Sequence, residues 1–355
     1  TIYAIYEKNT NSMNFSLKKP QESFHLNGYS LKDFILNYNY ELKEFDSTLV
    51  DENGKIINVL LQKDSSSLFE NCSYLKKINI SNFNTKNVTD MSYMFYGCNN
   101  LTDLNVENFN TENVTNMSYM FCNCEKLNNL NLSNFNTENV TNMRDMFDTC
   151  MRLEKLNLNG FNTRNVKNMS QMFYSCCDLT ELNLSNFNTE NVIDMSYMFW
   201  SCFNLKYLNI NNFNTKNVNK TSQMFGGTDK LKKIVLGQNI TKTVLSSLSN
   251  EWYKQPENTY YKSLYDSYDN MTSIAGTYVK LQNLSIKWLD KTKNNRPEYV
   301  VVKIYDTNGF GGSIKDEEES GSGSGSGSDN SSESGSSSES GSGSGSGTNE
   351  DKLLG

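Results

Sequence analysis

The sequence predicts an α/β solenoid, in which one structural unit of 26 residues is repeated along the chain. Six cysteines are each separated by 26 residues, and a leucine column and a Met-Phe pair recur with the same period. The cysteines are Cys72, Cys98, Cys124, Cys150, Cys176 and Cys202. Such a strict period indicates stacked repeats rather than one globular core.

Each unit combines two periodicities. Residues 75–83 have the L-x-x-L-x-L-x-x-F type of spacing, which is typical of a short strand whose alternate side chains point inward. Residues 88–98 place Val, Met, Met, Phe and Cys at i, i+3, i+6, i+7 and i+10, which is one face of a helix. Asn87 is a suitable N-cap, and Asp90 completes a capping box. We therefore predict a strand, a turn, a short helix and a turn in each repeat.

The column pattern also predicts the boundaries of the array. Thr221, Thr228 and Val235 replace the Met, Cys and Asn of their columns, so the repeats end shortly after them. The region before the repeats is expected to be β, with Asn53-Gly54 as a hairpin signal. A single repeat cannot bury its apolar face, so caps are required. The predicted parts are an N-terminal β cap at 9–64, the repeats at 65–237 and a C-terminal capping segment at 238–281.

Charge and composition exclude several functions. The net charge is -7, but residues 316–355 contribute nine acidic side chains against one lysine, which leaves residues 1–315 at +1. A near-neutral body without a basic stripe argues against nucleic-acid binding. No apolar run approaches the ~18 residues that a membrane span needs. Residues 313–355 are Gly, Ser and acid with few apolar side chains, so we expect a disordered linker there.

The cysteines raise the alternatives of zinc sites, disulfides and buried thiols. Neighbouring repeats on a helical side would lie ~8 to 10 Å apart, beyond the ~7 Å Cα limit for a disulfide. We therefore favour small buried apolar side chains for the column. Cys122 and Cys177 lie outside it and are the candidates for a reactive thiol. We predict no metal site and no cofactor.

Catalysis has little support in the sequence. His25 is the single histidine of the chain, and neither a Gly-rich phosphate loop nor a G-x-S-x-G elbow occurs. The acidic residues are scattered along the repeats. We therefore predict that the chain is not an enzyme.

One outward column of the predicted strands is the first candidate for ligand binding, because its residue type varies on an otherwise regular face. A specific ligand would be recognised at such positions, and ordinary solvated surface is the alternative. The column consists of Lys77, Asp103, Asn129, Lys155, Glu181, Tyr207 and Lys233.

A second outward column is an asparagine ladder, with Asn105, Asn131, Asn157 and Asn183 as candidate binding residues. It has two interpretations, a site for a periodic ligand such as a glycan chain and amide-to-amide stacking, of which we favour stacking. Aromatic residues recur on the other side of the repeat, and we interpret them mainly as partly buried packing. They are Tyr93, Tyr96, Tyr119, Tyr174, Tyr197 and Trp200.

Residues 127–143 (LNNLNLSNFNTENVTNM), followed by Met146-Phe147 and Cys150, closely resemble the BspA-type leucine-rich repeats of bacterial surface proteins. This resemblance implies a right-handed, leucine-rich-repeat-like solenoid on a secreted or wall-attached protein, often called an adhesin. Residues 284–309 resemble the opening strands of a Cna B-type wall-stalk domain, which we place at 282–312. Residues 1–8 resemble the end of an upstream β repeat of the internalin type.

From these features we expect a non-catalytic extracellular module at the cell surface or in the cell wall, acting as a monomer. Its sheet face would recognise a surface protein or a glycan of a host or neighbouring cell. Two alternatives remain open, a non-binding spacer of a cell-surface stalk and an accessory module of a larger surface enzyme.

Overall fold

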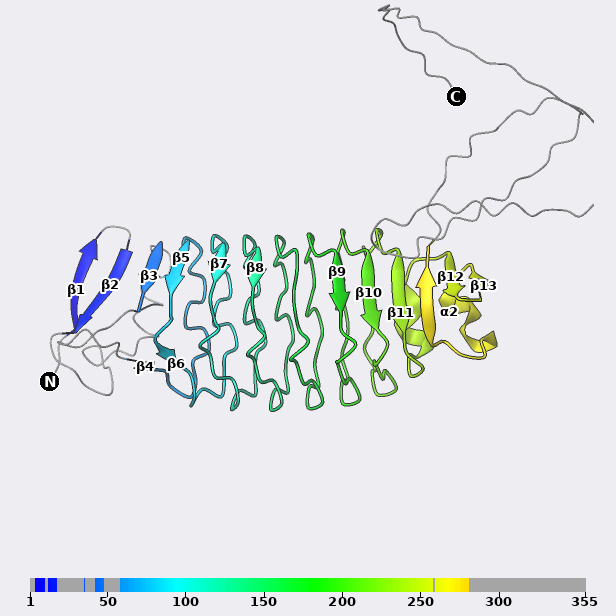
Figure 1. Ribbon diagram of the computed structural model, residues 1–355, viewed down its shortest axis with the longest axis horizontal. Helices are drawn as coiled ribbons and strands as arrows, with labels where there is room; N and C mark the ends of the chain where they lie inside the picture. Colours follow the sequence, from blue (N-terminus) through cyan, green and yellow to red (C-terminus); the bar gives the residue numbers. More distant parts are fainter. Residues whose placement is uncertain are drawn as a thin grey trace, which may run out of the picture. The chain divides into compact units, whose positions relative to one another are not determined.

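The computed structural model describes residues 4–9, 12–17, 35, 42–47, 58–257 and 259–280. These residues belong to one compact unit, residues 1–306. In it, about seven coils stack into a β-solenoid, with parallel pairing between residues 26 positions apart (Figure 1). The predicted 26-residue solenoid is thus confirmed. The predictions for Asn53-Gly54, for 282–312 and for 313–355 lie outside the described residues.

Short strands lie side by side along one side of the stack (Figure 1). They are β5 (Lys77–Asn79), β7 (Asp103–Leu104), β8 (Asn129–Leu130), β9 (Glu181–Asn183), β10 (Tyr207–Ile210) and β11 (Lys233–Leu236). A further short strand, β6 (Phe83–Asn84), lies in a separate two-stranded sheet. β7 pairs with β8, and β9, β10 and β11 pair in order, all in parallel. β6 pairs in parallel with β4 (Val59–Leu60). Because equivalent residues are partners, each sequence column becomes a column in space.

In place of the predicted short helix, residues 88–98 form successive turns. Tyr93 and Gly97 have φ values of 57° and 71°, which lie in the left-handed region and end a right-handed helix. The Met91 amide donates to Asn116 O of the next coil at 3.0 Å, and the amides two, four and six residues later continue this pattern. Alternate backbone groups therefore pair with the neighbouring coil, which gives a second ladder.

The predicted capping box is consequently wrong. Asp90 Oδ1 accepts hydrogen bonds from the backbone N–H of Ser92 at 2.8 Å and from its hydroxyl at 2.6 Å, which closes a turn within one coil. Asn87 precedes a turn and caps no helix.

The core is built in columns. The Phe147 ring stacks between those of Phe121 and Phe173, with centroids 5.8 and 5.7 Å apart. The six column cysteines are fully buried, which confirms that prediction. Their sulfur atoms also link the coils, as where Cys150 Sγ donates to Phe121 O at 3.1 Å. The core therefore continues through the coils without a break between them.

Buried threonines hold adjacent coils together, a role that the sequence pattern does not reveal. Thr137 Oγ1 accepts a hydrogen bond from the backbone N–H of Asn162 at 2.8 Å and donates one to the backbone oxygen of Asn162 at 3.0 Å. Thr85, Thr111 and Thr189 make the same pair of contacts with the following coil. Each of these hydroxyl groups satisfies a backbone donor and acceptor that a turn would otherwise leave unpaired.

Further elements flank the repeats. On the N-terminal side they are β1 (Ala4–Asn9), β2 (Ser12–Leu17) and β3 (Glu44–Asp46). On the C-terminal side they are η1 (Lys242–Ser247), β12 (Trp252–Gln255), β13 (Thr259–Tyr261), α2 (Leu264–Ser267), η2 (Tyr268–Asn270) and β14 (Gly276–Val279). β3 pairs with β5, and β14 pairs antiparallel with β11, so the first and the last strand of the array each pair with a strand outside it.

Within the ranges given above, no helix has the length and apolarity to cross a membrane.

Candidate functional site

The candidate binding residues lie on the outer surface of the strands, which we call the sheet face. Strand alternation predicts this placement, because side chains next to the inward leucines must point outward. Most of the candidates are exposed, whereas Tyr207 and Lys233 are half-buried. The sheet face is therefore accessible to a ligand over several coils.

A hollow of about 600 Å³ on the sheet face brings seven of the eleven candidate residues together. They are Asn129, Asn131, Lys155, Asn157, Glu181, Asn183 and Tyr207. Glu107, Leu156 and Asn159 also line the hollow, which crosses five successive coils. The varied column and the asparagine column thus meet in one place.

The hollow lies where the strand ladder is interrupted. Residues 154–158 lie between β8 and β9 but form no strand. Within the described residues, no backbone hydrogen bond joins residues 155–157 to either neighbouring strand. Leu156 is only half-buried, although its equivalents Leu130 and Leu182 are 4% and 1% exposed. This coil therefore presents backbone groups and part of a leucine side chain to the hollow.

The asparagine column differs from the amide-to-amide stacking that we favour from the sequence. Asn157 Oδ1 accepts the backbone N–H of Asn159, and Asn183 Oδ1 accepts that of Ser185, both at 3.1 Å. Each carbonyl oxygen thus closes a turn in its own coil. In the described part of the chain, the Nδ2 groups of these two asparagines have no hydrogen-bond partner. Both amide groups are left to donate outward.

The walls of the hollow carry both donors and acceptors. Lys155, Glu107 and Glu181 all line the hollow, and the Glu107 carboxylate accepts from Asn131 Nδ2 at 2.7 Å. Partial burial raises the pKa of Tyr207, so its phenol remains a proton donor at neutral pH. The arrangement suits a polar ligand that offers both hydroxyl donors and acceptors.

Four candidates lie outside the hollow, namely Lys77, Asp103, Asn105 and Lys233. Lys77 Nζ is 3.3 Å from Glu44 Oε1, and this ion pair is exposed. Lys233 Nζ lies 5.5 Å from the ring centroid of Tyr207. The structure therefore divides the varied column into a central group and two flanking groups.

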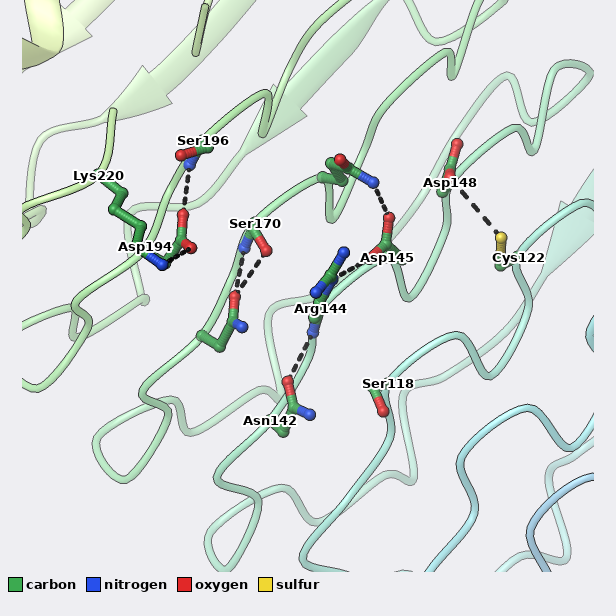
Figure 2. Close-up of polar contacts among 12 residues, drawn as sticks. Ser118, Cys122, Asn142, Arg144, Asp145, Asp148, Ser170, Asp194, Ser196 and Lys220 are labelled. Atoms are coloured by element: carbon green, nitrogen blue, oxygen red, sulfur yellow. Dashed lines mark hydrogen bonds and ion pairs between the residues drawn. The ribbon is translucent and has the colours of Figure 1, made fainter. Parts of the chain in front are cut away.

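A second polar cluster lies on the turn face, which we define as residues 88–98 and their equivalents in later coils (Figure 2). The side chain of Asp145 is fully buried and accepts hydrogen bonds from Arg144 Nε at 2.6 Å and from Gln171 Nε2. The Arg144 guanidinium also lies 5.6 Å from the ring centroid of Tyr119. Partners within the chain satisfy this carboxylate, which gives it a structural role.

The recurring aromatic residues are divided by this cluster. Tyr93 stacks on Tyr119 with centroids 4.4 Å apart, and Tyr174 stacks on Trp200 at 4.8 Å. These rings are half-buried and cover one another, as packing requires. The column pattern does not predict this acidic cluster, although Asp145 stands out in a column that also contains Tyr93, Tyr119 and Tyr197.

The two candidate thiols are not activated. Cys122 Sγ donates to Asp148 Oδ2 at 3.7 Å, and the Thr149 hydroxyl donates to Oδ1 at 2.7 Å (Figure 2 shows the first contact). Burial raises the pKa of both Cys122 and Cys177, which disfavours the nucleophilic thiolate. Among the described residues, no group of three or more His, Cys, Asp or Glu side chains is arranged to hold a metal ion.

Burial raises the pKa of Asp148 to about 6, above the ~3.9 of an unfolded aspartate. The folded chain therefore binds this proton more tightly, and its stabilising contribution is lost as the pH rises through 6. Asp148→Asn should raise the free energy of unfolding by about 1 to 2 kcal/mol at about pH 7.5 and change it little at about pH 4. Urea unfolding of both proteins at the two pH values measures this. An equal effect at both would contradict the assignment.

The repeat region matches one known protein family. The family described as "Mycoplasma protein of unknown function, DUF285" matches residues 63–180 and 150–255, which together span more than half of the chain. Its matches cover the region that forms the coils, including the hollow and the turn-face cluster. No curated protein matches the chain.

Proposed function

We propose that this chain, which belongs to the DUF285 family, is a non-catalytic binding module that recognises a protein or a glycan through its sheet face. The hollow carries this proposal, because the varied column, the asparagine column and the interrupted ladder coincide there. The similarity of residues 127–143 to repeats of bacterial surface proteins supports a location outside the cell, at its surface.

The solenoid is well suited to binding because it holds its outward side chains at fixed positions. Ladder hydrogen bonds flank the hollow on both sides, between β7 and β8 and between β9, β10 and β11. Preorganised side chains lose less conformational entropy when a ligand binds, which favours affinity. Replacement of residues on such a face changes recognition without changing the fold.

Charge reversal within the hollow tests the proposal. Lys155→Glu and Glu181→Lys should each weaken binding of the full chain to host-cell surfaces, matrix proteins or glycans by about tenfold or more, because each removes a wall group and inverts its charge. Binding of the purified chain to each class of surface is the measurement.

Lys77→Glu is the matched control, since Lys77 occupies the same column outside the hollow. It should bind as the unchanged chain does, and circular dichroism should show all three variants folded. Unaltered binding by the Lys155 and Glu181 variants would refute the proposed role of the sheet face and favour a spacer.

A further inference from the structure

The sheet-face hollow presents amide donors in a fixed orientation. Because Asn157 Oδ1 and Asn183 Oδ1 are both held by backbone N–H groups of their own coils, each amide plane is fixed and its NH₂ group faces away from the turn. The two asparagines occupy the same position in successive coils. The hollow therefore offers two such NH₂ groups, one from each of two successive coils.

The hollow also presents hydrogen-bond acceptors and unpaired backbone groups. Glu181 supplies an exposed carboxylate, and the interrupted ladder leaves backbone N–H and C=O groups of residues 155–157 unpaired within the described structure. A sugar hydroxyl donates one hydrogen bond and accepts others, so it can use both kinds of group. The composition of the walls matches a ligand that is rich in hydroxyl groups.

Four apolar or aromatic residues line the hollow, and two of them, Leu130 and Leu158, are buried. Leu156 is half-buried at its centre, and Tyr207 lies at one end with Lys233 over its ring. The anchors that dominate protein interfaces are Trp, Tyr and Arg side chains in desolvated pockets. The lining contains one tyrosine and neither tryptophan nor arginine. This favours a glycan over a protein, because a ring face of tyrosine and a small apolar floor suffice for the C–H faces of sugars.

The spacing of the donors favours a linear chain. Paired strands lie about 4.7 to 4.9 Å apart, so equivalent side chains of successive paired coils are separated by about that distance. A pyranose residue advances an extended glycan by a comparable distance. Sugar residues lying along the stacking direction would therefore meet one coil each.

We infer that the hollow binds a neutral, linear oligosaccharide along the stacking direction, with the amide groups of Asn157 and Asn183 donating to its hydroxyl oxygens. This inference rests on the proposed binding function and specifies its ligand class. Because the hollow crosses five coils, affinity should increase with chain length up to about five sugar residues.

Aspartate substitution separates the donors from the turn that holds them. Asn157→Asp and Asn183→Asp keep the oxygen that closes each turn but remove the NH₂ donors. Each should weaken binding of neutral oligosaccharides by about tenfold or more. Asn105→Asp is the control, because Asn105 Oδ1 also accepts a backbone N–H, from Glu107 at 2.9 Å, but Asn105 lies outside the hollow. The control should bind as the unchanged chain does.

The probe is an array of neutral linear oligosaccharides from disaccharide to hexasaccharide, applied to the full chain at low and high salt. Binding that increases with length, survives high salt and is lost in the two hollow variants supports the inference. If no oligosaccharide binds, but Lys155→Glu abolishes attachment to a protein or a cell, the ligand class is wrong and the proposed function stands. If oligosaccharides bind equally to all variants, the assignment to the asparagines is overturned.

Discussion

Replacement of Phe147 by alanine should lower the free energy of unfolding by about 3 to 5 kcal/mol, which is the range for truncation of a buried phenylalanine. The ring is fully buried and stacks on Phe121 and Phe173, so its removal leaves a cavity in the middle of the core and breaks two ring contacts. The surrounding coils cannot close this cavity easily, because turn-face hydrogen bonds join all three coils and β7 also pairs with β8. Equilibrium unfolding in urea, followed by circular dichroism, measures the change.

Tyr74→Ala provides the control for an aromatic side chain that lies at the surface. Tyr74 is 53% exposed, and its loss should change the free energy of unfolding by less than about 0.5 kcal/mol. A loss of less than about 1 kcal/mol in Phe147→Ala would show that the stacked column does not support the fold.

Replacement of Thr137 by valine should destabilise the chain by about 2 to 4 kcal/mol, although the two side chains have nearly the same shape. The substitution removes the hydroxyl that pairs with both the N–H and the C=O of Asn162 in the next coil. Thr137 is fully buried, so water cannot readily replace either hydrogen bond. The same urea experiment gives the magnitude.

Thr141→Val is the matched control. Thr141 is exposed, and its hydroxyl donates to Thr115 O at 3.2 Å, where water can substitute. We expect a change within about 0.5 kcal/mol. Equal effects at the two positions would contradict the view that buried threonines join the coils.

The repeat period determines the columns of the fold, and so the sequence predicts which side chains point inward. It does not distinguish a helix from successive turns at residues 88–98, because both place Met91, Met94 and Phe95 on the core side. The turns form because Tyr93 has a positive φ, a conformation that a tyrosine in the sequence does not predict. At Gly97 the sequence does indicate a positive φ, since glycine adopts it readily.

The sequence predicts which side chains lie on the sheet face, but it does not predict the hollow. Alternation along the strands places Lys155 and Asn157 outward, and the structure has them on the sheet face. The hollow itself cannot be predicted, because residues 154–158 read EKLNL and the paired residues 180–184 read TELNL. Whether such similar segments pair is a property of the tertiary structure and not of the local sequence.

Deletion of one whole repeat tests most directly whether the hollow of the sheet face is the binding site. Removal of residues 154–179 joins Leu153 to Thr180 in register and eliminates the central wall of the hollow. Removal of residues 76–101 shortens the array equally and leaves the hollow intact.

Binding of the two shortened chains to the surface that the full chain recognises is the decisive measurement. We predict that both fold, that the chain without residues 76–101 binds as the full chain does, and that the chain without residues 154–179 does not bind. Equal binding by both shortened chains would contradict a binding site in the hollow.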